Sequence, residues 1–120
     1  MGYTQGTGDL HRTKTTAAVT LGSSNSAASV AVNGTRGTLT VTLNGTLVYD
    51  AVTRAGPLTV TSQSIKADSV VQVATITDAS ILVYDVYAVQ DGSFKFEFLN
   101  LTGGHLTGDP SLSFAYMVFN

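Results

Sequence analysis

Two histidines are the chain's candidates for a general base near neutral pH, because histidine titrates in that range and the chain contains no cysteine. A nucleophilic triad would place one of them beside a hydroxyl or thiol and an orienting carboxylate. His11 lies in a polar N-terminal stretch and His105 in a glycine-rich loop, settings that are typical of surface or interface histidines. The sequence therefore predicts no catalytic residue, and we expect that the protein is not an enzyme.

The acidic residues are too scattered to hold a metal ion. Calcium loops alternate their acids, and zinc sites combine histidine, cysteine and carboxylate at short spacings, and neither pattern occurs. Gly6 and Gly8 lack the flanking strand and helix of a phosphate-binding loop, so no metal and no cofactor is expected. Glu97 lies between Phe96 and Phe98 and is predicted to be a solvated strand residue rather than half of a glycosidase acid pair. The acids are Asp9, Asp50, Asp68, Asp78, Asp85, Asp91, Glu97 and Asp109.

The charge of the chain argues against nucleic acid as a partner. Six basic and eight acidic residues among 120 give a net charge of −2, whereas a duplex binder needs clustered lysine and arginine. Apolar residues reach 43% and charged residues only 12%, so the surface is thinly charged. No stretch approaches the ~18 consecutive apolar residues of a membrane span, and the N-terminus lacks a signal-peptide core. We therefore expect no membrane partner and synthesis in the cytoplasm.

Alternation with period two predicts an all-β fold. Leu39, Val41 and Leu43 alternate with Thr40 and Thr42, the pattern of a strand with one face in a core and the other in water. Eight or so such segments separated by turn residues favour an antiparallel β-sandwich or jelly roll of about eight strands. The expected strands lie near 28–32, 38–43, 46–52, 58–62, 69–76, 81–89, 93–99 and 111–119.

Turn chemistry predicts how some of these strands are joined. Asn33-Gly34, Asn44-Gly45 and Asp91-Gly92 each separate two period-two segments, and these dipeptides tolerate the positive φ angles of tight hairpin turns. Hairpins are therefore expected at all three places. The final strand carries Met117 and Phe119 opposite its other apolar residues, which predicts burial on both faces.

The aromatic strand has two possible roles. Phe94, Phe96 and Phe98 point one way from a strand, which is typical of a hydrophobic core. Together with Tyr84 and Tyr87 of the preceding segment, they would alternatively form a platform on which sugar rings stack. The core is the expected role, and the platform stays the alternative.

The first 26 residues differ in composition from the rest. Their glycine, serine and threonine content cannot form a core locally, so an extended N-terminal arm is expected over residues 1–26, followed by a sandwich domain over 27–120. The backbone groups of such an arm need partners outside it, and the edge of another chain's sheet would supply them. The expected partner contacts are the basic group His11, Arg12 and Lys14, which would meet an acidic surface or else be merely solvated, and the apolar group Ala17, Val19 and Leu21.

Residues 56–120 resemble a pattern found in small virion proteins of tailed bacteriophages, including capsid decoration (cement) proteins and tail-fibre modules. In that family a polar turn leads into an apolar strand, a hairpin follows, the next strand ends in asparagine, and a last apolar strand ends the pattern. The corresponding places here are Ser62 to Ile65, Ser69 to Val71, Asp91 to Phe94, Asn100, and Phe114 to Phe119.

The resemblance implies a β-sandwich, often trimeric, that is built into a virion. It leads us to expect a capsid decoration protein that binds the outer surface of the major capsid protein lattice and stabilises the head. Such a protein would assemble in the host cytoplasm, form a homotrimer and reside on the capsid surface. A receptor- or glycan-binding fibre tip is the alternative that the same family implies.

Overall fold

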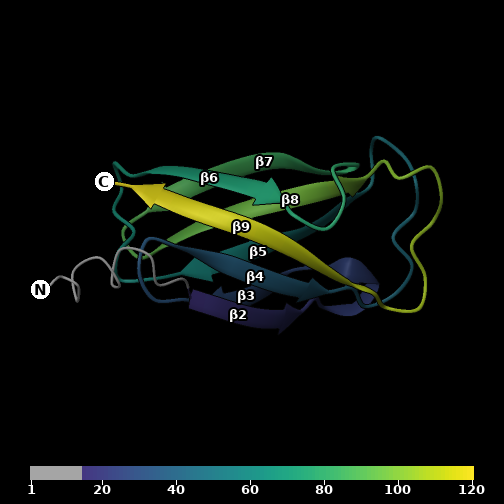
Figure 1. Cartoon of the computed structure of the whole chain (residues 1–120), viewed down its shortest axis with the longest axis horizontal. Helices are drawn as coiled ribbons and strands as arrows, with labels where there is room; N and C mark the ends of the chain where they lie inside the picture. Colours follow the sequence, from purple (N-terminus) through teal and green to yellow (C-terminus); the bar gives the residue numbers. More distant parts are fainter. Residues whose placement is uncertain (1–14) are drawn as a thin grey trace, which may run out of the picture.

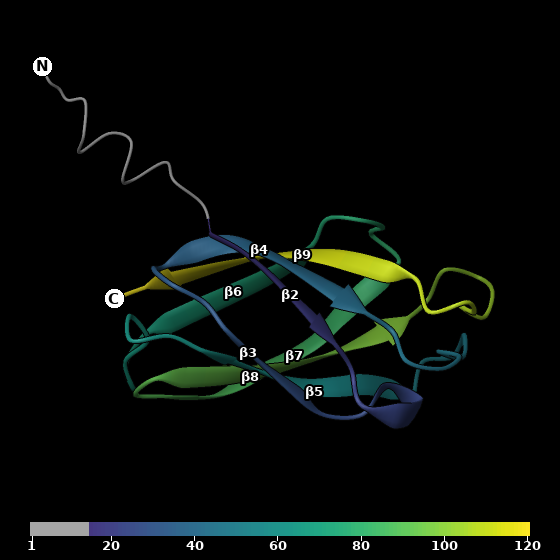
Figure 2. The ribbon, with the colours of Figure 1, turned by 90° about the horizontal axis from the view of Figure 1, so that it is seen from below.

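The strands of the computed structural model, which describes residues 15–120, form two four-stranded sheets packed face to face. One sheet has the order β2-β4-β9-β6 and the other β3-β5-β8-β7 (Figure 1). Figure 2, turned by 90°, shows the two sheets as separate layers. The buried hydrophobic side chains of both sheets form one core cluster. The elements are β2 (Thr15–Thr20), the 3-10 turn η1 (Ser23–Asn25), β3 (Ala28–Ala31), β4 (Arg36–Thr42), β5 (Arg54–Thr61), β6 (Val70–Thr75), β7 (Ile81–Gln90), β8 (Ser93–Asn100) and β9 (Ser111–Phe119).

The predicted all-β sandwich is confirmed, but its sheets are mixed rather than purely antiparallel. β2 pairs with β4 in parallel, and β3 pairs with β5 in parallel, while the remaining pairings are antiparallel. The cause is the path of the chain, because each of the first connections crosses to the opposite sheet and reverses direction. Strands that are two apart in sequence therefore return to the same sheet running the same way.

Two of the three expected hairpins are absent for this reason. Asn33-Gly34 joins β3 to β4 in the opposite sheet, and Asn44-Gly45 opens the long connection from β4 to β5. The strand expected over 46–52 does not form, since only Leu47 makes a bridge there, with Leu106. Asp91-Gly92 does close a hairpin between β7 and β8, with Gly92 at a φ of 91°, as predicted.

Residues 15–26 belong to the sandwich, which corrects the expectation of an arm reaching residue 26. β2 pairs with β4 over its whole length, and the amide of Leu21 donates to the carbonyl of Thr42 at 3.0 Å. The side chain of Asn25 is buried, and its Oδ1 accepts the amide of Asn44 at 2.7 Å. The small and β-branched residues of β2 thus form a strand in a sheet of the same chain rather than an extended arm. The other residues of the expected arm, 1–14, lie outside the described part of the chain.

Aromatic rings from both sheets form the centre of the core. Phe94, Phe96 and Phe98 of β8 are fully buried, which confirms the core role expected for them. The ring of Phe114 on β9 lies 5.3 Å from that of Phe96 and 4.9 Å from that of Phe98, measured between centroids. Since β8 and β9 belong to different sheets, these contacts hold the layers together.

The prediction that β9 is buried on both faces is wrong. Phe114, Tyr116 and Val118 are buried, whereas Met117 is 40% and Phe119 46% exposed. β9 is central in its sheet, but no further layer of the described chain covers that sheet's outer side. The exposed apolar residues of β9 therefore belong to a surface, not to a second core.

Candidate functional site

Of the two histidines that the sequence offers as candidate general bases, the structure describes His105. His105 is exposed, and its Nδ1 accepts a 2.9 Å hydrogen bond from the backbone amide of Tyr49, which gives it a structural role in the β4–β5 connection. No group of three or more potential metal ligands occurs within residues 15–120. His11 precedes the described residues. The surface of the sandwich offers an outer face on each sheet and a cleft at one end.

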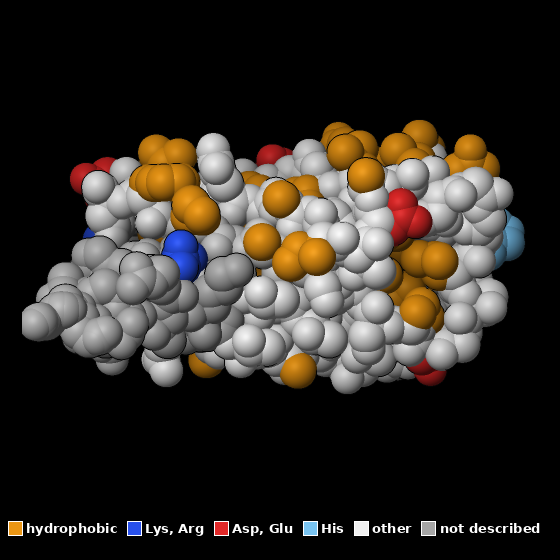
Figure 3. Space-filling view, viewed as in Figure 1, with side chains coloured by type: hydrophobic (Ala, Val, Ile, Leu, Met, Phe, Trp, Pro, Cys, Tyr) orange, Lys and Arg blue, Asp and Glu red, His pale blue; other side chains and the backbone are white. Residues whose placement is uncertain are grey.

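The outer side of the β2-β4-β9-β6 sheet carries short, mostly uncharged side chains, and we call it the threonine-rich face. Alternation places one residue in two of each strand on this side, exposed or half-buried. In Figure 3 the area over β4 and β9 is mainly white and orange. Its residues are Thr16, Ala18, Thr20, Arg36, Thr38, Thr40, Thr42, Val70, Gln72, Ala74, Ser111, Ser113, Ala115, Met117 and Phe119.

The threonine-rich face suits contact with another protein surface. Arg36 is the one charged side chain among its residues, so covering the face would remove few charges from water, which is the costly step in burying a surface. Val70 of β6 is the cross-strand neighbour of Phe119 of β9, and these two side chains make one end of the face apolar. Short side chains on a sheet leave a surface that a partner can approach closely.

The outer side of the other sheet is different, because charged and aromatic groups meet there. Arg54 donates to Glu97 at 3.0 Å, and its guanidinium carbon lies 4.4 Å from the ring centroid of Tyr84. The hydroxyl of Tyr87 donates to the second oxygen of Glu97 at 3.3 Å. Asp85 is the cross-strand neighbour of Glu97 on β7. We call these residues, Arg54, Tyr84, Asp85, Tyr87 and Glu97, the polar cluster.

Glu97 is less solvated than the sequence predicts. Its side chain is 16% exposed because it is held between Arg54 and Tyr87. The hydrogen bond to Glu97 raises the pKa of Arg54 above its usual value. Desolvation, followed by the charge of Glu97, raises the pKa of Tyr87. Both shifts favour the charged form of Arg54 and the neutral form of Tyr87, the forms that donate these hydrogen bonds to Glu97.

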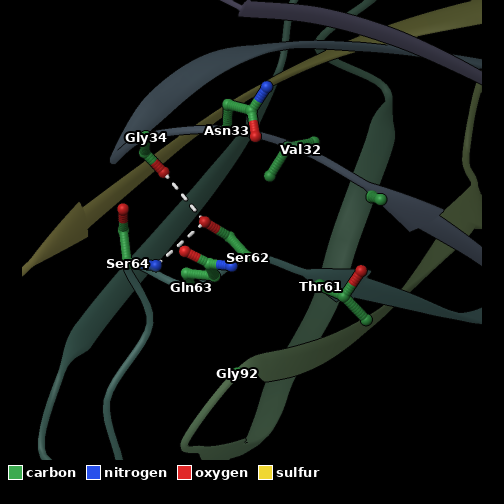
Figure 4. Close-up of a pocket in the computed structure, with 9 residues that line it drawn as sticks. Val32, Asn33, Gly34, Thr61, Ser62, Gln63, Ser64 and Gly92 are labelled. Atoms are coloured by element: carbon green, nitrogen blue, oxygen red, sulfur yellow. Dashed lines mark hydrogen bonds between the residues drawn. The ribbon is translucent and has the colours of Figure 1, made fainter.

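A cleft of about 500 Å³ opens at one end of the sandwich, between the β3–β4 turn and the segment after β5 (Figure 4). Ser62 organises it, because its hydroxyl donates to the carbonyl of Gly34 at 3.3 Å and accepts the amide of Ser64 at 3.1 Å. Asn33 and Gln63 add side-chain amides to its lining. None of the lining residues is charged or a histidine, so the cleft offers neutral hydrogen-bonding groups and no acid–base pair.

The structure describes three of the six residues that the sequence predicts to contact a partner. Ala17 and Val19 point inward from β2 and pack against the core, and Leu21 is 1% exposed. These three side chains therefore serve this chain's own core, and a partner that meets β2 would touch Ala18 and Thr20 instead. His11, Arg12 and Lys14 lie outside the described residues.

The threonine-rich face could not be predicted from the sequence, because its residues come from four separate strands. Threonine alternation in β4 was visible, but which strands flank β4 was not. The polar cluster was missed for the same reason, since Arg54 and Glu97 meet only through the β5–β8 pairing.

Comparisons with protein-family models, with curated proteins and with solved structures found no match to this chain. No helix in the described part of the chain is long and apolar enough to cross a membrane.

Proposed function

We propose that the protein is a bacteriophage capsid decoration (cement) protein, which binds the outer surface of the major capsid protein lattice and stabilises the head. The resemblance of residues 56–120 to small phage virion proteins supports this proposal. The observation that carries it is the threonine-rich face, a broad, thinly charged surface of the sandwich. Its place in the virion would be the capsid surface.

The proposal fits the physical character of the face. A cementing protein has to cover subunit boundaries, and its contact area has to lose water at little cost. Uncharged threonine, serine and alanine side chains meet that requirement better than a charged surface, which would need matching countercharges on the capsid. The partners proposed are the major capsid protein and further copies of this chain in a homotrimer, a closed symmetry that suits a threefold position of a shell.

The test is a binding measurement on purified phage shells that lack the protein, with matched substitutions on opposite sheets. Thr40→Glu puts a charge in the middle of the threonine-rich face, next to Ser113. Thr59→Glu puts the same charge on the outer side of the other sheet, next to Lys95. We expect wild type and Thr59→Glu to bind and Thr40→Glu to lose most of its occupancy.

The same experiment can refute the proposal. Wild-type protein that leaves the shells bare would refute the decoration role. Equal binding by both variants, with circular dichroism confirming that both are folded, would move the contact surface away from the threonine-rich face.

A glycan- or receptor-binding fibre tip is the second candidate, and the polar cluster favours it. Tyr84 is 50% exposed and lies beside Arg54 and the two carboxylates of Asp85 and Glu97. An aromatic ring with convergent hydrogen-bonding groups is a common arrangement in ligand sites. A glycan array probed with wild type and Tyr84→Ala would test it: binding that the substitution abolishes supports this candidate, and an array without signal rejects it.

A further inference from the structure

Two of the predicted turns contain the residue pair in which asparagine most readily loses its side-chain amide. In an Asn-Gly pair the backbone nitrogen of the glycine can attack the side-chain carbonyl carbon of the asparagine, because glycine has no side chain that hinders the approach. Asn33-Gly34-Thr35 and Asn44-Gly45-Thr46 have the same three residue types in the same order. The local sequence therefore gives both sites the same chemistry, and the fold decides how fast each one reacts.

Hydrogen bonds hold both reacting groups of Asn44-Gly45. The amide of Gly45, which would be the attacking nitrogen, donates to Oδ1 of Asp109 at 2.9 Å. The side-chain amide of Asn44 donates to the carbonyl of Leu21 at 3.2 Å, and its backbone amide donates to Oδ1 of Asn25 at 2.7 Å. The reaction would have to break these bonds, so the fold protects this site even though Asn44 and Gly45 are exposed.

The reacting groups of Asn33-Gly34 are not held in this way. The side-chain amide of Asn33 and the backbone amide of Gly34 make no hydrogen bond to a residue of the described chain. Gly34 is held through its carbonyl, which accepts the hydroxyl of Ser62 at 3.3 Å. Apart from the adjacent residues, no atom of the described chain lies within 4 Å of the place that a side chain at Gly34 would occupy. Both residues are exposed, so water can reach this turn.

The aspartate pair at the β7–β8 hairpin resembles the protected site. Asp91-Gly92 can isomerise through the same kind of ring, but the amide of Gly92 donates to the carbonyl of Ile65 at 2.9 Å. Oδ1 of Asp91 accepts the amide of Ala67 at 2.9 Å. Within residues 15–120, Asn33-Gly34 thus differs from both of the other pairs in the hydrogen bonding of its reacting groups.

We infer that Asn33 is a site of spontaneous deamidation and that the fold protects Asn44 from the same reaction. The nitrogen of Gly34 loses its proton and attacks Cγ of Asn33. The new N–Cγ bond closes a cyclic succinimide, and the Cγ–Nδ2 bond breaks and releases ammonia. Water then opens the ring, at Cγ to give aspartate or at the backbone carbonyl carbon to give isoaspartate. The net reaction consumes water and releases ammonia, and it needs no oxidant, reductant or enzyme.

The modification would change the cleft that Asn33 lines (Figure 4). The residues that line this cleft are neutral, so the product places a carboxylate where the unmodified protein has none. The chain becomes one unit more negative than its formal charge of −2. The isoaspartate product also lengthens the backbone of the turn between β3 and β4, which joins the two sheets. The cleft therefore changes from neutral to negatively charged as the protein ages.

Peptide mapping by mass spectrometry follows both sites in one sample of the intact protein, incubated in mildly alkaline buffer. The rate at each site is divided by the rate of the same site in urea-unfolded chain, so that any effect of local sequence cancels. We expect Asn44 to be better protected than Asn33 by about tenfold, which corresponds to about 1.4 kcal/mol and is of the order that two hydrogen bonds contribute. Protection of Asn44 that does not exceed that of Asn33 would overturn the inference.

Two substitutions of Asp109 test the cause of the protection. Asp109→Gly removes the acceptor of the Gly45 amide and suits the φ of 51° at this position, whereas Asp109→Asn keeps an acceptor oxygen. We expect Asp109→Gly to speed deamidation at Asn44 and to leave the rate at Asn33 unchanged, and Asp109→Asn to match wild type at both sites.

Circular dichroism establishes that both variants are folded. A folded Asp109→Gly protein with an unchanged rate at Asn44 would overturn the assignment of protection to this hydrogen bond. If Asp109→Gly does not fold, the comparison of the two sites in wild type decides. None of these measurements involves phage shells, so their outcome is independent of the proposed decoration role.

Discussion

The side-chain amide of Asn100 donates a 2.9 Å hydrogen bond to the carbonyl oxygen of Leu47, and it thereby ties the end of β8 to the long connection between β4 and β5. The same amide donates to Gly104 at 2.9 Å, and the side-chain oxygen accepts the amide of Thr102 at 3.0 Å. Asn100 is fully buried, so these bonds replace water that it cannot reach. One side chain thus joins two loops at the same end of the sandwich.

Replacing Asn100 with leucine should destabilise the protein by about 1–3 kcal/mol, because buried backbone groups lose their partners. Urea unfolding followed by circular dichroism measures this change. Asn33→Leu, at an exposed turn, is the matched control and should stay within about 0.5 kcal/mol of wild type. Equal stabilities of the two variants would mean that the Asn100 bonds contribute nothing.

Phe96→Ala should cost about 3–5 kcal/mol, because it removes a ring that is buried between the sheets and contacts Phe114. Phe119→Ala removes an equal ring from a half-exposed position and should cost far less. Thermal melts of both variants provide the comparison. A Phe96→Ala protein as stable as wild type would contradict the placement of this ring in the core.

Truncation distinguishes the two parts of the stretch expected to be an arm. A chain that starts at Thr15 keeps every described strand and should retain the melting temperature of the sandwich. A chain that starts at Ala27 loses β2 and the buried Leu21, whose removal alone is worth about 2–5 kcal/mol. Identical melts for the two truncations would show that β2 adds nothing to the fold.

Acid should loosen the turn at Asp50. Its carboxylate accepts the backbone amides of Thr53 and Val52 and the Thr53 hydroxyl, and these bonds lower its pKa below the usual value. Because the pKa of Asp50 is lower in the folded protein than in the unfolded chain, its ionised carboxylate stabilises the fold at pH values above the unfolded-state pKa, which is about 4. This stabilisation is lost as the pH falls through the folded-state pKa. NMR should show the Thr53 amide signal shifting in that acid range, and Asp50→Asn should remove the transition. A shift that persists in Asp50→Asn would assign it to another group.

His105→Ala should leave function unchanged, since the contacts of this histidine, with the amide of Tyr49 and with the charge of Asp50, lie within one loop. Wild type and His105→Ala should show no difference when screened with chromogenic ester, phosphate and glycoside substrates. Hydrolysis that disappears in the variant would contradict the expectation that the protein is not an enzyme.

Local sequence patterns predicted the strands better than their arrangement. The alternation around Leu39 and around Phe96, and the turn at Asp91-Gly92, depend on neighbouring residues and were predictable. Asn33-Gly34 has the same turn chemistry, yet it joins strands of different sheets, because tertiary pairing decides where the chain goes after a turn. The small residues of β2 carry little hydrophobic signal, so their strand is defined only by its pairing with β4.

The functional surfaces depend on that arrangement even more strongly. Arg54 and Glu97 are brought together by one strand pairing, and the threonine-rich face needs all four strands of its sheet in order. Only the core role of the phenylalanines could be predicted from one segment, because three large rings on one side of a strand are too apolar to remain in water.

The position of β9 constrains how the protein is made. This strand follows all the other described strands in the sequence, yet it lies between β4 and β6 in the middle of its sheet. During synthesis β4 and β6 leave the ribosome before the strand that connects them, so β6 has no partner strand, and β4 has only β2, until β9 follows. Only the β7–β8 hairpin can form early from neighbouring residues, so folding of this sheet should be slow and should wait for β9, with exposed strand edges that make the nascent chain prone to aggregation.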